Sequence, residues 1–576
     1  MFKKEIEKLI KKAVKKDFGF DLENIEIEKP QEESFGDYAT NTALTISKKA
    51  GIKPMEIATK LKKTMAECQS DLLSRIETVP PGFINFFLSE KYLIKQLNRV
   101  LEEGSKYGSS KVGKGKKIII DYSSPNIAKS FGVGHLRSTI IGQAIYNIYK
   151  FSGWECIGDN HLGDWGTQFG KVIYQLKKNK TDLKKIKIDD LERDYIDFHK
   201  QVQDNPKMEE EARNWFKKME EGNKEAKKIW QICRDISFEE FNKIYKLLDI
   251  KIDYSLSESF YQKMLGEIIS EAMEKKITSK SEGALVVKHS DEKSVPAMLL
   301  KSDGATTYLT RDLATIKYRL KRWKPDLIVY EVGKEQELYF QQLFWVANLL
   351  GWAKKDIFYH LSHGLIRFEH QKISTRTGRT IRLKEILGEA VKRAKGVINE
   401  SETSRDFSDK EKDKIATEVG VGAVKYNDLS HHRSKDIIFD WDKILNLKGN
   451  SGPYIQYTYA RCQSVLKKGN FRVFIAKNIS KLNNEVKIGE EEKNILRVIS
   501  FFPEVVKNSA QSFSPNLICN FAFDLAQKYN TFYNCEPINK AKNPQTRKLR
   551  LFLTFGVAQV LKNSLSLLGI SSPERM

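Results

Sequence analysis

The chain contains 576 residues, 40% of them hydrophobic and 30% charged, a balance that is typical of a folded multidomain protein and excludes a disordered or fibrous one. Its 98 Lys and Arg residues outnumber its 75 Asp and Glu residues, so the formal net charge is +23. This excess favours a polyanionic partner, because basic side chains displace counterions from a phosphate backbone, but a lysine-rich composition alone would give the same charge.

The cysteines stand singly and form no C-x-x-C pair, so the sequence predicts neither a zinc knuckle nor a disulfide framework. They are Cys68, Cys156, Cys233, Cys462, Cys519 and Cys535. No apolar run is long enough to span a membrane. We therefore expect a cytoplasmic protein that holds no zinc and has no membrane partner.

Residues 1–106 predict an N-terminal domain in which helices alternate with strands. Its first segment is basic and amphipathic, and the acidic residues in that segment argue against an organelle presequence. One face of this segment carries Phe2, Ile6, Leu9, Ile10 and Ala13. A helical pattern at 52–67 and a β-like run at 82–88 follow, and the stretch 104–117, rich in Gly, Ser and Lys, predicts a linker.

The next segment predicts a strand, a glycine-bearing loop and a helix N-terminus in succession. Ile118 to Ile120 form the strand, and the sequence then runs DYSSPNIAKSFGVGHLRSTIIG over residues 121–142. Such a loop presents backbone N–H groups and a positive dipole end to a phosphate. It also gathers polar donors where a parallel strand ends, which is where open α/β sheets bind ligands. These donors are Asn126, Lys129, His135, Arg137 and Ser138.

The rest of the chain predicts further units of a doubly wound sheet, followed by helices. A charged, helical insertion is expected at about 177–250, and nearly everything after Lys410 has a helical pattern, including an amphipathic bundle at 501–568. Strand signals lie at 154–157, 284–287, 297–300, 326–329 and 357–361. A polar loop, QKISTRTGRTIR, follows the last of these strands.

Several of these segments resemble one known family. The run SPNIAKSFGVGHLRST is similar to the His-Ile-Gly-His loop of class I aminoacyl-tRNA synthetases, in the extended form of arginyl-tRNA synthetases. Further similar motifs are NHLGDWGTQFG (160–170), YLTRDLAT (308–315), VGKEQELYFQQLF (332–344) and LKGNSGPYIQYTYAR (447–461). Near the N-terminus, PQEESFGDYATNTALTISKK and PPGFINFFL resemble the family's additional domain.

The resemblance implies an α/β multidomain architecture. It implies an α+β N-terminal domain (1–106) that contacts the tRNA core and a Rossmann-like catalytic domain (107–400) that carries the helical insertion. A linking helical segment (401–446) and an all-α anticodon-binding bundle (447–576) would complete the chain.

An ATP site is expected from the chemistry of this family. A carboxylate attacks the α-phosphate of ATP, and catalysis of such a displacement consists largely of positioning and of neutralising charge on the phosphates. The resemblance implies Lys129, His135 and Lys372 as catalytic residues. The implied ATP contacts are Gly132, Gly134, His135, Gly333, Lys372 and Ser374. Mg²⁺ is expected with ATP, and its ligands stay unassigned.

Two positions depart from the class pattern. Gly132 stands where the first histidine of the His-Ile-Gly-His pattern is expected, so one ATP contact is missing. The segment 372–376 resembles the mobile Lys-Met-Ser-Lys-Ser loop, but Thr375 replaces its second lysine. Arginyl enzymes share this second departure, and the resemblance implies that Lys129 supplies the missing charge.

An arginine pocket requires planar acceptors, because bidentate carboxylate pairs suit a guanidinium. The resemblance implies that Asn126 and Gln336 hold the α-amino and carboxylate ends of the substrate. Glu258, Tyr308 and Asp312 would hold the rest. Tyr308 and Asp312 lie four residues apart and are expected on one helical face.

Contacts with tRNA are expected in the C-terminal domain, at Tyr454, Tyr457 and Arg461. The tyrosines, including Tyr459, could stack on unpaired bases, but packing within a helix explains their spacing equally well. His431 and His432 are adjacent, which is poor spacing for a shared metal, so no metal site is predicted.

Ligation of L-arginine to its tRNA, with ATP as the energy source, is the function that the resemblance implies. A monomer is expected, and so is a requirement for bound tRNA before arginine is activated. The alternatives are a class I synthetase of another specificity, a nucleotidylyltransferase that shares the nucleotide loop, and a basic RNA-binding scaffold whose loop has lost its activity.

Overall fold

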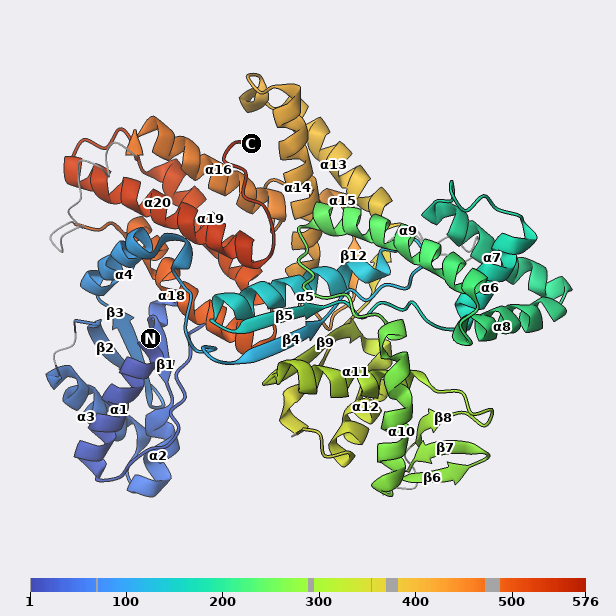
Figure 1. The fold of residues 1–576 in the computed structure, drawn as a ribbon. Helices are drawn as coiled ribbons and strands as arrows, with labels where there is room; N and C mark the ends of the chain where they lie inside the picture. Colours follow the sequence, from blue (N-terminus) through green and yellow to red (C-terminus); the bar gives the residue numbers. More distant parts are fainter. Residues whose placement is uncertain (1, 69–70, 289–294, 354, 369–381, 472–486) are drawn as a thin grey trace.

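The computed structural model describes residues 2–68, 71–288, 295–353, 355–368, 382–471 and 487–576 (Figure 1). An α+β region lies at the N-terminal end, a parallel sheet with helices on its faces forms the centre, and helices make up the C-terminal end. No helix within these ranges is both long and apolar enough to cross a membrane.

The N-terminal region packs helices against an antiparallel sheet with the strand order β1-β3-β2. Helix α1 buries the expected apolar face, including Phe2, Ile6 and Ile10. The strands are β1 (Tyr38–Thr40), β2 (Leu73–Val79) and β3 (Phe83–Leu88). The helices are α1 (Phe2–Phe18), α2 (Thr42–Ala50), α3 (Pro54–Glu67) and α4 (Glu90–Glu103), with short 3₁₀ turns η1 (Glu33–Phe35) and η2 (Gly104–Lys106).

The central sheet is parallel and has the order β10-β9-β4-β5. Ile118, Ile119 and Ile120 of β4 are completely buried, which explains why this strand is uniformly apolar. Since β5 lies on one side of β4 and β9 on the other, the strand order reverses at β4, and a crevice for ligands is expected at its carboxyl end. The strands are β4 (Lys117–Asp121), β5 (Glu155–Asp159), β9 (Leu327–Gly333) and β10 (Phe358–His363).

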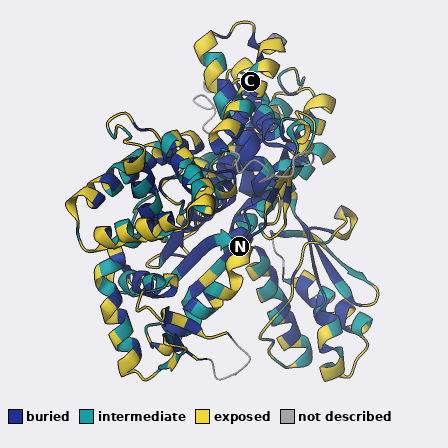
Figure 2. Ribbon diagram, turned by 90° about the vertical axis from the view of Figure 1, so that its right-hand side faces the viewer, coloured by how far each residue is buried: buried dark blue, intermediate teal, exposed yellow. Residues whose placement is uncertain are grey.

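Helices cover both faces of this sheet and connect its strands (Figures 1 and 2). Helix α5 joins β4 to β5 and is buried over most of its length, and α12 joins β9 to β10. The helices of this region are α5 (Gly134–Phe151), α6 (Thr167–Lys178), α7 (Ile188–Asp204), α8 (Lys207–Glu220), α9 (Lys224–Leu248), α10 (Leu265–Glu274), α11 (Tyr308–Trp323) and α12 (Glu337–Leu349). The 3₁₀ segments are η3 (Glu258–Met264), η4 (Lys334–Gln336) and η5 (Lys355–Ile357).

Two of the strands expected from the sequence belong to a separate sheet. The strands β6 (Thr278–Ser281), β7 (Ala284–Val287) and β8 (Ala297–Leu300) form an antiparallel sheet of their own beside α10 and α12 (Figure 1). Their alternation of buried and more exposed residues fits a sheet that is covered on one face only.

The C-terminal part of the chain is mostly helical. A short parallel pair, β11 (Ile366–Phe368) with β12 (Ile437–Phe439), lies among its first helices. The helices are α13 (Leu383–Glu400), α14 (Asp409–Leu429), α15 (Trp441–Ile444), α16 (Gly452–Lys468), α18 (Glu490–Ser512), α19 (Asn516–Cys535) and α20 (Pro544–Leu567), with the 3₁₀ turn η6 (Glu402–Ser404). Their apolar faces pack into the same core as the parallel sheet (Figure 2).

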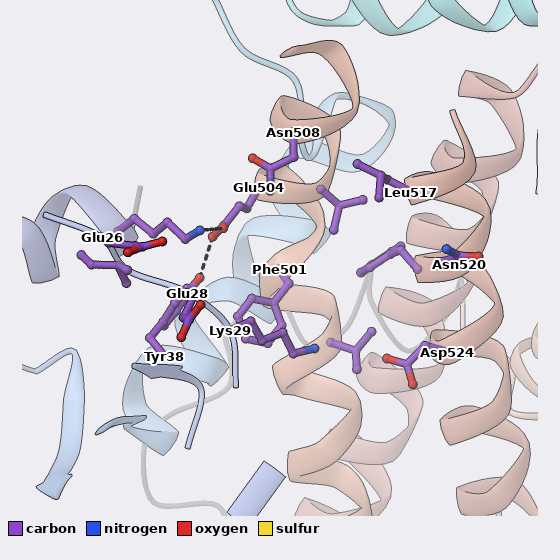
Figure 3. Close-up of a pocket in the computed structure, with 15 residues that line it drawn as sticks. Glu26, Glu28, Lys29, Tyr38, Phe501, Glu504, Asn508, Leu517, Asn520 and Asp524 are labelled. Carbon is purple, nitrogen blue, oxygen red and sulfur yellow. Dashed lines mark hydrogen bonds and ion pairs between the residues drawn. The ribbon is translucent and has the colours of Figure 1, made fainter. Parts of the chain in front are cut away.

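A groove of about 490 Å³ lies between the N-terminal region and helices α18 and α19 (Figure 3). Glu504 of α18 forms an ion pair with Lys3 at 2.7 Å and accepts a hydrogen bond from Tyr38 at 2.8 Å. The ammonium of Lys29 lies 4.6 Å from the centre of the Phe501 ring. No residue of the parallel strands is among those that line the groove, so it is a contact between domains and lies apart from the strand ends.

Candidate active site at the strand ends

The loop after β4 is held in place by neighbouring segments. Asn160, just after β5, accepts a hydrogen bond from the backbone N–H of Ser124 at 3.0 Å, and Ser237 of α9 accepts one from Ala128 at 2.9 Å. Ser123, Ser124 and Ala128 have positive φ angles of 74°, 44° and 61°. Non-glycine residues adopt this conformation rarely, and it clusters at functional sites.

The N-terminus of α5 is open and polar. Helix α5 begins at Gly134, and no described atom lies within 4 Å of the place that a Cβ would take there. Burial lowers the pKa of His135, the backbone carbonyl of Gly132 opposes this effect, and the charges of Lys129 and His363 lower the pKa further. Nδ1 of His135 is buried and has no hydrogen-bond partner among the described residues. The helix end therefore offers backbone N–H groups and a neutral imidazole to an anion.

Lys129 reaches from the same loop towards the helical insertion. Its ammonium lies 4.8 Å from the centre of the Tyr195 ring of α7. Ser130, the next residue, donates a hydrogen bond to Glu192 of α7 at 2.6 Å. Helix α7 therefore fixes this end of the loop.

The end of the second loop returns to the first. Lys372 and Ser374, and with them Thr375 and Arg376, lie outside the described residues. Arg382 forms an antiparallel bridge with Gly132, and the N–H of Leu383 donates to the carbonyl of Phe131 at 2.9 Å. Since Arg382 directly follows the second loop, the two loops are adjacent at this point.

A buried charge cluster ties the strand ends to α11. Arg319 of α11 donates hydrogen bonds to Asp121, at the end of β4, and to Asp159, at the end of β5, at 2.6 and 2.8 Å. Burial raises the pKa of Asp159, and the charge of Arg319 opposes this effect. Arg319 is completely buried, so the cluster holds α11 against both strands.

Helix α11 brings Asp312 and its neighbours to the strand ends, as its position in the sequence predicts. The carboxylate of Asp312 lies 3.4 Å from Nε2 of His161 and accepts a hydrogen bond from Tyr339. Burial lowers the pKa of His161, but the hydrogen bond and charge of Asp312 outweigh burial and raise it to about 9. The imidazole of His161 is thus cationic and lies beside the carboxylate of Asp312. Tyr308, one turn earlier, is 65% exposed.

Glu258 lies in η3, at the edge of the same cluster. Arg311 of α11 forms an ion pair with its carboxylate at 3.2 Å. Burial raises the pKa of Glu258 to about 7, and the charge of Asp312 contributes to this rise while Arg311 opposes it. The carboxylate is therefore already in contact with a guanidinium, the group that an arginine pocket has to recognise.

Asn126, Gly333 and Gln336 lie at the same edge of the sheet. Asn126 is exposed, and its segment pairs with Gly163: Ile127 donates to the Gly163 carbonyl at 3.2 Å. Gly333 ends β9, and Gln336 is exposed in η4, directly after it. The structure thus brings the described residues of the expected ATP and arginine sites to neighbouring strand ends.

Tyr454, Tyr457 and Arg461 form one cluster on α16. Arg461 donates to Asn530 at 2.6 Å and to the hydroxyl of Tyr457 at 3.3 Å, and Asn530 donates to the hydroxyl of Tyr454 at 3.0 Å. Tyr459 is 1% exposed, so stacking of Tyr459 on a base is excluded. Its ring belongs to the helical core.

Two results differ from the reading of the sequence. Arg137 is not a donor for a ligand: its side chain is 1% exposed and binds Asp428 at 3.2 Å and the carbonyl of Lys435 at 2.7 Å. Conversely, His161 received no role from the sequence, although it belongs to the NHLGDWGTQFG motif. A histidine directly after a strand end was the available signal for it.

Comparison with known proteins covers nearly the whole chain. A model of the catalytic domain of class I tRNA synthetases (R) matches residues 96–441. The model of the arginyl-tRNA synthetase N-terminal domain matches residues 3–88, and that of the DALR anticodon binding domain matches residues 455–576. The chain belongs to the arginyl-tRNA synthetase family.

Relatives and solved structures agree with this membership. The chain is 40% identical to the arginine–tRNA ligase of Fusobacterium nucleatum, over 96% of each chain. It is also 40% identical to that of Clostridioides difficile, over 96% of this chain and 95% of the relative. The arginyl-tRNA synthetase of Plasmodium falciparum superimposes with a TM-score of 0.83 at 27% identity, covering 100% of this chain and 99% of that one. The Thermus thermophilus structure, with a TM-score of 0.81 at 21% identity and full coverage of both chains, shows the same fold.

Proposed function

We propose that the strand-end site joins L-arginine to the tRNA for arginine. Arginine reacts with ATP to give arginyl-adenylate and pyrophosphate, and the arginyl group then passes to the 3′ end of the tRNA with release of AMP. The observation that carries this function is the match of all three family models, in order, along one chain.

ATP is bound by the two adjacent loops. His135 and the backbone of Gly134 contact the phosphates or the ribose at the start of α5, and Gly132 and Gly333 allow close approach. Lys129 and Lys372 neutralise charge that develops on the phosphates during the displacement. Ser374 completes the contacts from the second loop.

Arginine is bound on the α11 side. Asp312 and Glu258 accept hydrogen bonds from the guanidinium, and Tyr308 covers it. Asn126 and Gln336 hold the α-amino and carboxylate groups at the strand ends. His161 and Tyr339 keep the Asp312 carboxylate in place.

The remaining assignments concern domains and partners. The N-terminal domain (1–106) contacts the tRNA core. The catalytic domain spans 107–400, with its insertion at about 177–250, and segment 401–446 links it to the helical bundle. Residues 447–576 form this bundle and bind the anticodon through Tyr454, Tyr457 and Arg461. Mg²⁺ accompanies ATP, and in the described part of the chain no group of three or more His, Cys, Asp and Glu side chains could hold a metal ion. The protein acts as a cytoplasmic monomer without zinc.

An aminoacylation assay with each of the twenty amino acids and total tRNA tests the function. Charging with arginine alone is expected, and charging with any other amino acid in its place would refute the proposal. Pyrophosphate exchange with and without tRNA tests the order of events: exchange should require tRNA, and full exchange in its absence would refute that requirement.

A further inference from the structure

A buried carboxylate and a histidine lie at the ends of β9 and β10, and the assignments above give them no role. Glu331 is 1% exposed and His363 is 8% exposed. Nδ1 of His363 lies 2.9 Å from Oε1 of Glu331. A carboxylate on one ring nitrogen fixes the orientation of the imidazole.

The surroundings hold this histidine rigidly. Arg433 donates a hydrogen bond to the carbonyl of Ser362 at 3.0 Å, and the N–H of Gly364 donates to the carbonyl of Arg433 at 3.0 Å. The backbone on both sides of His363 is therefore fixed, and the ring is fixed by Glu331. Such preorganisation is expected of a group that binds a ligand, although it also suits a purely structural pair.

The second ring nitrogen of His363 lies beside Gly333, one of the proposed ATP contacts. Nε2 lies 3.8 Å from the place where a Cβ on Gly333 would stand, so it adjoins the end of β9. The charge of His363 also contributes to the lowered pKa of His135. β10 ends at His363, and the chain then continues through β11 towards the second loop. His363 therefore lies at the same strand ends as Gly333.

We infer that His363, oriented by Glu331, contacts ATP and fills the role left open by Gly132. Nδ1 is engaged by Glu331, which leaves Nε2 to form a hydrogen bond with a phosphate or ribose oxygen of ATP. This inference rests on the proposed function, because it assigns the oxygen acceptor to ATP.

The test measures pyrophosphate exchange by the full-length chain, with tRNA present, as a function of ATP and of arginine. In H363A the KM for ATP should rise about 10- to 100-fold, the usual value of a hydrogen bond to a charged oxygen. The KM for arginine should stay close to that of the wild type. E331Q keeps a hydrogen bond to the ring but loses the charge, so its KM for ATP should rise less. H360A is the matched control: His360 lies on the same strand but stacks on Phe340 at 4.5 Å, and its KM for ATP should not change.

A second substitution distinguishes contact of His363 with ATP from a purely structural role of His363. Adding G132H to H363A should restore most of the affinity for ATP, since a histidine returns to the crevice from the other loop. An unchanged KM for ATP in H363A, or equal losses for ATP and arginine that G132H does not restore, would overturn the inference. If H363A does not fold, H363Q and E331Q give the same comparison. Lack of arginine-dependent exchange in the wild type would instead refute the proposed function.

Discussion

The two sides of the strand-end site differ in how their polar groups are satisfied. On the nucleotide side, Gly134 borders open space and Nδ1 of His135 has no hydrogen-bond partner in the described part of the chain. On the arginine side, the carboxylates of Glu258 and Asp312 already bind Arg311, His161 and Tyr339. The nucleotide side can therefore bind an anion, whereas the carboxylates of the arginine side already have partners in the chain.

This difference predicts different effects on the two substrates. ATP adds new hydrogen bonds to donors that lack partners, so its binding should depend on single groups such as Lys129. Arginine has to join or replace contacts that the chain makes with itself, and the contact between Arg311 and Glu258 has the same chemistry as the contact with substrate. If Glu258 binds the substrate as proposed, selectivity for arginine depends on the exchange of one guanidinium for another.

The largest effect is expected for Lys129→Met. Loss of a charge that stabilises the phosphates should lower kcat for pyrophosphate exchange about 100- to 1,000-fold while the KM for arginine changes little. Lys171→Met is the matched control, because its ammonium also lies over a ring of the insertion, 5.5 Å from the centre of Phe198. Comparable rates in Lys129→Met and the wild type would remove Lys129 from the nucleotide side.

A smaller effect is expected for Asp312→Asn. This variant loses the anion that would bind the guanidinium, so the KM for arginine should rise about 10- to 100-fold, since hydrogen bonds to charged groups are worth about 1.5–3 kcal/mol. The KM for ATP should not change. Asp303→Asn, in the turn before α11, serves as control. Equal losses for both substrates would show that Asp312 supports the whole site and not the arginine side alone.

The smallest effect is a pH dependence of arginine binding. The pKa of Glu258 is raised by burial to about 7, so this carboxyl is mostly neutral at pH 6 and mostly ionised at pH 8. If the anion binds arginine, the KM for arginine should be about tenfold higher at pH 6 than at pH 8. Because the unfolded chain ionises Glu258 at lower pH, this group should also make folding less favourable as pH rises from about 4.5 to 7.

Glu258→Gln tests whether Glu258 causes both the pH dependence of the KM for arginine and the pH dependence of stability. In this variant the dependence of the KM for arginine on pH should disappear between pH 6 and pH 8, and so should the matching contribution to thermal stability. If the KM for arginine in Glu258→Gln still depended on pH in this range, another group would be responsible.

Local patterns predicted the elements of the site better than its contacts. The strand, loop and helix from Ile118 to Phe151 follow from β-branched residues, turn residues and apolar periodicity, and α11 carries Tyr308 and Asp312 on one helix as expected. These features depend on neighbours in sequence, which explains why they can be read directly from the chain.

Contacts between distant segments could not be predicted in this way. Arg137 looked like a loop donor, but Asp428, which binds it, lies 291 residues later. Likewise, His363 gains its partner only when β9 and β10 lie side by side. Tyr459 shares its helix with Tyr454 and Tyr457, yet the bundle buries Tyr459 and leaves the other two partly accessible.

The ion cluster of Arg319 limits when, during synthesis, the ends of β4 and β5 can reach their final arrangement. Its guanidinium binds carboxylates that precede it by 198 and 160 residues. During synthesis, β4 and β5 emerge from the ribosome long before Arg319, and until it arrives their ends would hold two negative charges without a counterion. Because the cluster needs residue 319 of 576, it can form only after more than half of the chain has been made.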